Sequence, residues 1–108
     1  MTTFKYVQGD TRPQLQVALS NETTSTPIDL TGANVKLHFR AAGETTVLFS
    51  RDFTVTDASN GVAVLQFQAG DLEVEPGAYQ GEVEIVTSTG QRETLFDILK
   101  FKIREDFA

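Results

Sequence analysis

Hydrophobic and polar residues alternate with a period of two along most of the chain. The clearest case is residues 35–40, where Val35, Leu37 and Phe39 are separated by polar or charged side chains. A period of two places successive side chains on opposite faces of a strand, so that one face is buried and the other meets solvent. The same alternation predicts further strands at residues 15–19, 47–49, 53–55, 63–67, 79–85 and 93–103.

Turn-forming residues separate these segments. Asn60-Gly61 favours a turn because both residue types tolerate a positive φ, and Thr89-Gly90 is expected to close a hairpin. The polar residues 20–27 predict a loop, and one helical turn is an open alternative at residues 71–74. About seven short strands without a helical stripe predict an all-β fold. The expected architecture is an antiparallel immunoglobulin-like β-sandwich, with residues 1–108 as a single domain.

Two local patterns refine the sandwich. The segment Pro76-Gly77-Ala78-Tyr79 is typical of a tyrosine corner, in which the hydroxyl of Tyr79 bonds to an upstream backbone group. Position 81, where antibody domains carry their second cysteine, is a glycine, so packing alone must hold the core. In the last strand the apolar residues change parity between Ile98 and Leu99, which predicts a β-bulge there.

Composition narrows the classes of function. The chain has no cysteine, which excludes disulfides and thiol chemistry and fits folding in a reducing cytoplasm. Its 9 basic and 15 acidic residues give a net charge of −6, which disfavours binding to nucleic acid or to an anionic membrane. No signal peptide or membrane-spanning run is recognisable, so a soluble protein without membrane insertion is expected.

The sequence offers little for catalysis. His38 is the only histidine, and it lies on the outward parity between Lys36 and Arg40, where a solvated strand-face residue is the favoured interpretation. A hydrolytic triad needs a base beside a nucleophile, and the glycines are isolated turn residues rather than a phosphate loop. We therefore expect no enzyme activity, no catalytic residue, no metal ligand and no cofactor.

A window between Arg51 and Arg92 contains no lysine or arginine. The favoured interpretation is a solvated acidic face. A surface for a cationic partner comes next, and a calcium site comes last because the spacing of an Asp-x-Asp-x-Asp loop is missing. The acidic residues of this window are Asp52, Asp57, Asp71, Glu73, Glu75, Glu82 and Glu84.

Counting back from a tight turn at Thr89-Gly90 predicts which residues face each other across the last hairpin. It places Glu82 opposite Asp97, Val83 opposite Phe96 and Lys100 opposite Tyr79. The cations at the end of this strand are expected on its solvent side, where they discourage edge-to-edge aggregation. A head-to-tail contact between the acidic window of one copy and this strand of another is a hypothesis. The cations are Lys100, Lys102 and Arg104.

Three aromatic residues near the termini depart from the inward parity of the other rings. They either tuck onto the sandwich or dock on a neighbouring chain. Exposed flat rings of the kind that bind sugars are scarce, and tryptophan is absent. The candidate interface therefore combines these aromatics with three acidic residues: Phe4, Tyr6, Glu82, Glu84, Asp97 and Phe107.

Four strings in order resemble a known family. They are QGDTRPQ at 8–14, PIDLTGA at 27–33 followed by VKLHFR at 35–40, GAYQGEVEI at 77–85, and LKFKIREDF at 99–107. Together they are similar to the N-terminal immunoglobulin-like domain of bacteriophage baseplate upper proteins, including short stand-alone tail proteins. The resemblance extends over nearly the whole chain.

The resemblance implies a non-enzymatic structural protein of a phage or prophage tail or baseplate, acting as an adaptor or decoration module. It implies contacts with other tail or baseplate proteins, and homo-oligomers are an open alternative. It also implies assembly in the host cytoplasm and a final location in the tail of the virion. The alternative function is a carbohydrate- or ligand-binding accessory β-sandwich module.

Overall fold

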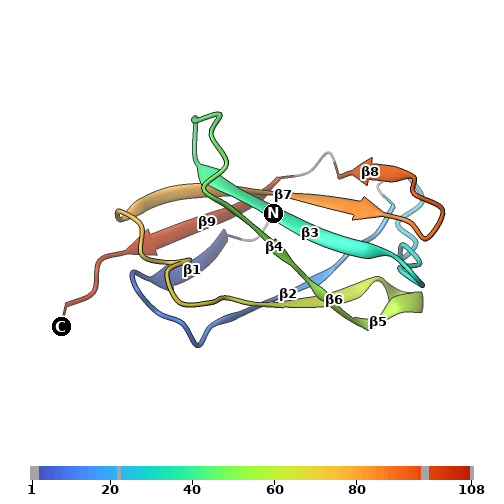
Figure 1. Cartoon of the computed structure of the whole chain (residues 1–108), viewed down its shortest axis with the longest axis horizontal. Coiled ribbons are helices and arrows are strands. Elements are labelled where there is room, and N and C mark those ends of the chain that lie inside the picture. The colour runs from blue at the N-terminus through green and yellow to red at the C-terminus, as the bar shows by residue number, and fades with distance from the viewer. Residues whose placement is uncertain (1–2, 22, 96–97, 108) are drawn as a thin grey trace.

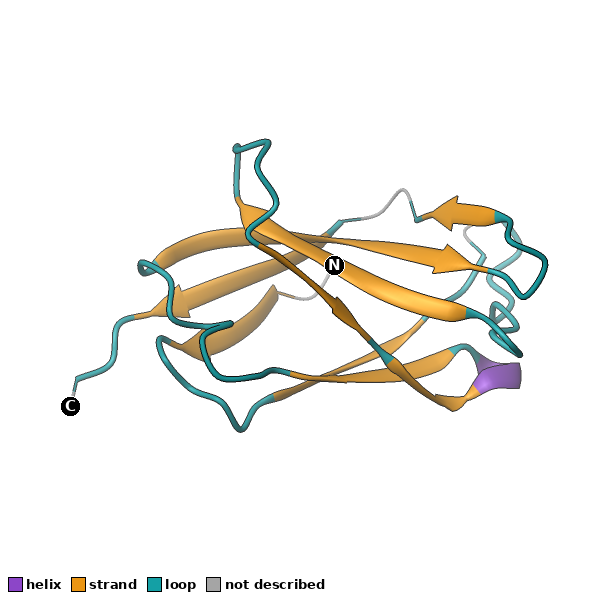
Figure 2. Ribbon diagram, viewed as in Figure 1, coloured by secondary structure: helices purple, strands orange, loops and turns teal. Residues whose placement is uncertain are grey.

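The computed structural model describes residues 3–21, 23–95 and 98–107, and within them two β-sheets pack face to face (Figures 1 and 2). The larger sheet has the strand order β1-β9-β7-β3-β4, with β8 also paired to β7, and the smaller sheet has the order β2-β6-β5. The strands are β1 (Thr3–Val7), β2 (Gln14–Ala18), β3 (Asn34–Ala41), β4 (Phe49–Asp52), β5 (Thr54–Asp57), β6 (Val62–Gln66), β7 (Gly77–Val86), β8 (Arg92–Thr94) and β9 (Leu99–Arg104).

This architecture confirms the predicted immunoglobulin-like sandwich, and the alternation of the sequence explains it. In β3 the apolar members Val35, Leu37 and Phe39 are buried, whereas the residues between them remain partly exposed. Apolar side chains from the facing surfaces of the two sheets therefore meet in one core. Its largest fully buried members are Phe39, Phe67, Phe101, Leu15, Leu30, Leu37, Leu65, Leu72, Ile103, Val35 and Val83.

The first strand was not predicted. β1 pairs in parallel with β9, and the rings of Phe4 and Tyr6 turn inward and pack against the core. The prediction that these two rings depart from the inward parity is therefore wrong, whereas the alternative that they tuck onto the sandwich is confirmed. A sequence signal was present, because Phe4 and Tyr6 alternate with the polar residues Thr3 and Lys5.

The two short strands predicted at residues 47–49 and 53–55 correspond to β4 and β5, between which the chain crosses from one sheet to the other. β4 pairs with β3 in the larger sheet, and β5 pairs with β6 in the smaller sheet. Phe53 lies between the two strands and is buried, and its backbone N–H donates to the carbonyl of Val35. The ring of Phe53 therefore packs where the chain crosses from one layer to the other, while residues 47 and 48 remain in the preceding hairpin loop.

The last predicted strand is two strands rather than one strand with a single-residue bulge. Both β8 and β9 pair with β7, but Glu84 faces Thr94 whereas Gly81 faces Leu99. On β7, two residues lie between Gly81 and Glu84. Four residues lie between their partners Leu99 and Thr94, so two extra residues lie between β8 and β9. Leu95 and Leu99 consequently share the inward parity, and each packs against the core.

The predicted hairpin register is wrong by one residue. Lys100 faces Gln80, not Tyr79, because Tyr79 faces Phe101. The predicted partners Phe96 and Asp97 lie outside the described residues.

The predicted turns are present, with one difference in helical content. A short 3₁₀ helix, η1 (Ala58–Asn60), is followed by Gly61 at a positive φ of 68°. Hydrogen bonds close the hairpin around Thr89-Gly90, including one from the N–H of Gly90 to the carbonyl of Thr87. The helical turn considered at residues 71–74 does not form, because that segment consists of turns held by bonds from the N–H groups of Asp71 and Glu73.

The tyrosine corner is confirmed. The hydroxyl of Tyr79 donates to the carbonyl oxygen of Glu75, and the ring stacks on Phe39 with 5.2 Å between centroids. Two residues later, a Cβ built on Gly81 would approach Leu37 and the ring of Phe101 to 2.7 and 2.8 Å. These two side chains fill the place that an antibody domain gives to a disulfide, so the glycine is needed for their close approach.

We expect Tyr79→Phe to lower the free energy of unfolding by about 1 kcal/mol, because it removes one hydrogen bond and leaves the ring in place. Burial, together with the charge of Glu75, raises the pKa of the Tyr79 hydroxyl. The hydroxyl of Tyr79 therefore contributes fully to the free energy of unfolding at a pH below the pKa of tyrosine in the unfolded chain. This contribution is lost as the pH rises through the higher pKa of the folded state. Urea denaturation at neutral and at alkaline pH should show the variant and the parent converging in stability.

Candidate interaction surfaces

One end of the outer face of the larger sheet carries charges of both signs. Glu84 on β7 lies 3.7 Å from His38 Nε2 and 3.7 Å from a guanidinium nitrogen of Arg92. Beside it, Lys36 Nζ lies 3.7 Å from a carboxylate oxygen of Asp52. Acidic side chains here stand next to basic ones, so this part of the face carries mixed charge rather than a single sign.

His38 is less exposed than predicted. Its side chain is 24% exposed, because Nδ1 shares a 2.7 Å hydrogen bond with the hydroxyl of Ser50 and Nε2 faces Glu84. These contacts fix the ring on the outward face of the sheet, so the predicted strand-face position is confirmed, but the ring is less solvated than predicted. No group of three or more His, Asp or Glu side chains that could hold a metal ion occurs in residues 3–21, 23–95 and 98–107.

Asp71 is the part of the acidic window that sequence reasoning placed wrongly. It is only 5% exposed, and its two carboxylate oxygens accept hydrogen bonds from Nε and a terminal nitrogen of Arg51. A third bond comes from the backbone N–H of Gln68 at 2.9 Å. Arg51 reaches Asp71 from the inner side of β4, where it faces Leu37 across the sheet and lies 5.6 Å from the ring of Phe49.

The remaining acidic residues of the window do not gather on one face. Asp52, Glu82 and Glu84 lie on the outer face of the larger sheet. Asp57 lies on β5 of the smaller sheet, and Glu73 and Glu75 are exposed on the connection between β6 and β7. The predicted solvated acidic face is therefore wrong as a single surface. Asp97, the third acidic member of the candidate interface, lies outside the described residues.

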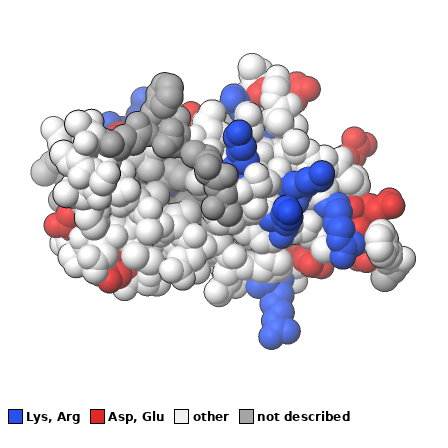
Figure 3. Space-filling view, turned by 180° about the vertical axis from the view of Figure 1, so that it is seen from behind, with Lys and Arg blue, Asp and Glu red and all other residues white. Residues whose placement is uncertain are grey.

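The other end of the same sheet carries a basic patch, which we define as Lys5, Lys100 and Lys102. Lys5 on β1 stands directly opposite Lys102 on β9, and Lys100 lies on the same face two residues earlier. Figure 3 shows most of the visible Lys and Arg side chains on one half of the molecule, with Asp and Glu side chains at its margin. Within the described ranges no carboxylate forms an ion pair with any of these three lysines.

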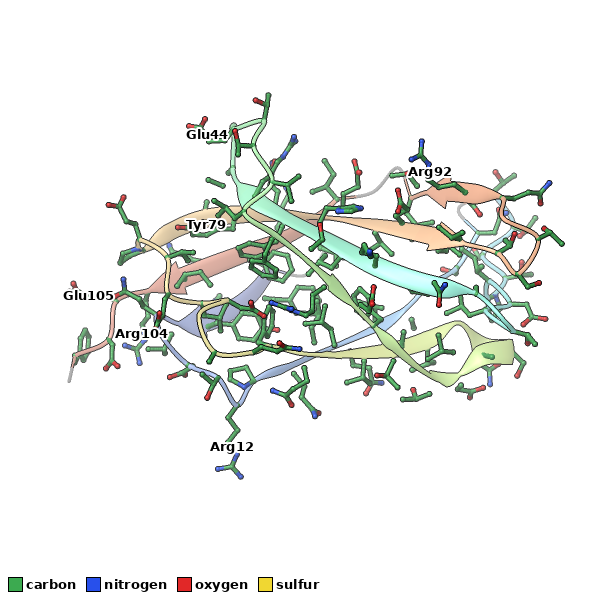
Figure 4. All side chains as sticks on the ribbon, viewed as in Figure 1. Arg12, Glu44, Tyr79, Arg92, Arg104 and Glu105 are labelled. Carbon is green, nitrogen blue, oxygen red and sulfur yellow. The ribbon has the colours of Figure 1, made fainter. Side chains whose placement is uncertain are left out.

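The predicted aromatic interface residues have different environments. Phe4 lies 5.6 Å from the ring of Phe101, and Tyr6 lies 5.1 Å from the ring of Phe67, so both rings complete the edge of the core. Burial raises the pKa of the Tyr6 hydroxyl. Phe107 is 85% exposed, and the guanidinium of Arg104 lies 4.9 Å from its centroid. Figure 4 shows Arg104 beside the C-terminal segment, away from the β8 end of the sheet.

A groove of about 730 Å³ opens between the two sheets at one side of the sandwich. Sequence reasoning missed it, since its walls come from segments far apart in the chain. One wall is formed by β2 and the loop that follows it, and the other by β7, β8 and the start of β9. Its lining is mixed, with hydroxyl, amide and carboxylate groups above an apolar floor that includes Leu19, Val83, Leu95 and Leu99.

Comparison with known proteins identifies a fold but no family. No family model and no curated protein matches the chain. Among solved structures, CopC from Methylosinus trichosporium OB3b is similar, with a TM-score of 0.54 and 7% identity over 96% of this chain and 86% of that one.

Two further structures overlap less well. PcoC, a copper resistance protein from Escherichia coli, has a TM-score of 0.43 and 12% identity over 94% of this chain and 91% of that one. Murine CRIg has a TM-score of 0.43 and 16% identity over 94% and 92%. At 7% identity the likeness to CopC shows a shared fold and nothing about what this chain binds. The resemblance to phage baseplate proteins stays a prediction.

Proposed function

We propose that this chain is a non-enzymatic structural module of a phage or prophage tail or baseplate, which joins other proteins through its surface. The four sequence strings support this proposal, and they fall on elements that shape the sandwich. The third string forms most of β7, and the fourth forms β9 and the segment after it. No described residue belongs to a helix long and apolar enough to cross a membrane.

The observation that carries the proposal is the basic patch. Like charges directly opposite each other on neighbouring strands destabilise a sheet, and Lys5 faces Lys102 in this way. The rest of the chain is acidic enough to give a net charge of −6, yet no carboxylate within the described ranges pairs with the patch. The repulsion between the lysines lowers the stability of the folded chain. An acidic partner protein would supply the opposite charge and so would account for the presence of the patch.

The partner that fits the patch is an acidic protein surface, on another tail protein or on a second copy of this chain. Phosphate-rich polymers would meet the repulsion of the remaining surface, because the chain is acidic overall. The patch would steer assembly and set its orientation more than it would add affinity, and its effect would weaken as salt screens the charges.

We expect Lys102→Gln to raise the melting temperature by roughly 1–3 °C, because it removes the repulsion with Lys5. The same change should weaken binding to a peptide of alternating Glu and Ser about threefold or more, as measured by fluorescence anisotropy at low salt. Arg12→Gln is the matched control, since it removes the same charge from an exposed loop residue. Figure 4 shows Arg12 pointing away from the two sheets.

Equal losses in the two variants, or tighter binding of a DNA oligonucleotide than of the peptide, would contradict the patch as a protein contact. The structural role itself is tested in particles purified from the virus or prophage that encodes the chain. Mass spectrometry should detect the chain in tails assembled with the parent protein and with Arg12→Gln. A chain absent from the particles, or reproducible hits on a glycan array, would favour the accessory-module alternative.

A further inference from the structure

The outer edge of β2 carries backbone groups that have no hydrogen-bond partner within the described residues, although the carbonyl of Gln14 accepts a bond from the Tyr6 hydroxyl at 3.5 Å. The N–H of Leu19 donates to the carbonyl of Gly61, and the N–H of Phe67 donates to that of Pro13. Bonded and non-bonded residue pairs alternate along an antiparallel ladder, so the odd-numbered residues of β2 bond to β6. The N–H and C=O groups of Gln16 and Ala18 therefore point away from the sheet, and nothing in the described part of the chain bonds to them.

β2 differs from the other edges in lacking the usual protection. Natural proteins block edge strands with charged side chains, prolines or bulges, because an open edge pairs with any available strand. β4 and β8 each carry charged residues, β1 carries Lys5, and β5 has a register shift between Val55 and Asp57. The sequence of β2, QLQVA, contains no charge and no proline, and its ladder with β6 is regular.

The groove begins at the C-terminal end of this same edge and could take the side chains of an added strand that extends past β2. Ala18, the last residue of β2, and Leu19 after it form one wall, and Val83, Leu95 and Leu99 form apolar surface on the opposite sheet. β1 begins at Thr3, opposite Lys100, so the described part of β1 does not cover the sheet beside β8. Alternate side chains of a strand bonded to β2 would point between the sheets and reach this apolar surface.

The charge of the groove indicates which kind of peptide segment would bind in it. Glu93 on β8 is the charged residue among the lining residues. It stands opposite Ile85 on β7, which places it on the inner side of the larger sheet. No ion pair within the described residues involves Glu93. An added strand with a lysine or arginine near this end would neutralise the carboxylate, whereas an acidic strand would be repelled.

We propose that β2 accepts an extended segment of a partner protein as an additional strand, with alternate apolar side chains in the groove and a basic residue facing Glu93. The main-chain bonds to Gln16 and Ala18 supply the affinity, and the groove supplies the selectivity, as in other cases of strand addition. This site opens between the two sheets, whereas the basic patch lies on the outer face of the larger sheet. The inference does not depend on a role in a phage tail.

The probe is a nine-residue peptide of alternating valine and threonine with one lysine near its end. On titration, amide exchange at Gln16 and Ala18 should slow about tenfold, whereas Leu15 and Val17 are protected with or without the peptide. Gln16→Pro removes an outward N–H without touching the ladder to β6, and it should weaken peptide binding about tenfold. Protection of Leu15 and Val17 in the variant reports that the sheet remains folded.

A second pair of variants keeps the test sound if Gln16→Pro disturbs the strand. Glu93→Gln should weaken binding of the lysine peptide several-fold and leave a glutamine-for-lysine peptide unchanged. Glu105→Gln is its matched control, a charge removal from the exposed C-terminal segment that Figure 4 labels.

Two results would overturn the proposal. The first is unchanged exchange at Gln16 and Ala18 in millimolar peptide. The second is their protection by self-association in the absence of peptide, which would make a second copy the occupant.

Discussion

Arg51→Met is expected to lower the free energy of unfolding by about 3 kcal/mol, the range in which breaking one side of a buried ion pair falls. The loss of stability arises because Asp71 would remain buried without its cation. Asp71 is 5% exposed and accepts three hydrogen bonds, two of them from Arg51. Without Arg51 the buried carboxylate would keep only the N–H of Gln68, while methionine would retain the packing of the arginine stem. Urea denaturation followed by circular dichroism measures the change.

The control for Arg51→Met is Lys100→Met, which removes an exposed cation that forms no ion pair within the described residues. Its stability should stay within about 0.5 kcal/mol of the parent. The double variant Arg51→Met/Asp71→Leu should recover part of the loss, because it removes the uncompensated charge. A loss of less than about 1 kcal/mol for Arg51→Met alone would show that water solvates Asp71 and that the pair is dispensable.

The Arg51–Asp71 pair matters for the architecture because of what it joins. Arg51 belongs to β4 at one edge of the larger sheet, and Asp71 belongs to the connection that leaves β6 in the smaller sheet. The bidentate contact therefore fixes the position of this connection, from which Leu72 enters the core and Glu75 accepts the bond of the tyrosine corner. Antibody domains join their sheets with a disulfide, and in this chain packing and the Arg51–Asp71 pair act in its place.

The period-two pattern was enough to predict the sandwich because burial of one face fixes the side on which each residue lies. It placed Val35, Leu37 and Phe39 correctly. It also held a signal that was overlooked. Arg51 occupies the inward parity between Phe49 and Phe53, and a cation at such a position needs a buried partner. The identity of that partner, Asp71, depends on how the connection after β6 folds back, which no local pattern contains.

The candidate surfaces were harder to predict because they depend on register and on tertiary placement. A one-residue error in the last hairpin changed every cross-strand partner, including that of Lys100. The opposition of Lys5 and Lys102 required knowing that β1 runs parallel to β9. The groove required knowing which edges remain open when two sheets stack, and this follows only from the complete strand order.

Gly61→Ala is expected to destabilise the fold by about 3 kcal/mol and to disturb the groove. Gly61 has a φ of 68°, and a Cβ on it would lie 2.4 Å from the carbonyl oxygen of Leu19 and 2.8 Å from that of Ile28. Because both contacts are to backbone, no side-chain rotation can relieve them. Leu19 and Ile28 also line the groove, so the chain there must shift for the alanine to fit.

Replacing Gly43 by alanine separates the two costs that Gly61→Ala combines, which are backbone strain at a positive φ and steric contact of the added Cβ. Gly43 has a φ of 82°, but no atom would lie within 4 Å of its Cβ, so its replacement costs only the backbone strain of about 1 kcal/mol. The difference between the two alanine variants in denaturation therefore measures the steric contact. In the Gly61 variant, amide exchange at Leu19 and Ile28 should accelerate, because both N–H groups form hydrogen bonds at this turn. Equal losses for the two variants would show that Leu19 and Ile28 yield freely, and that the wall of the groove beside β2 is not rigid enough to select a strand.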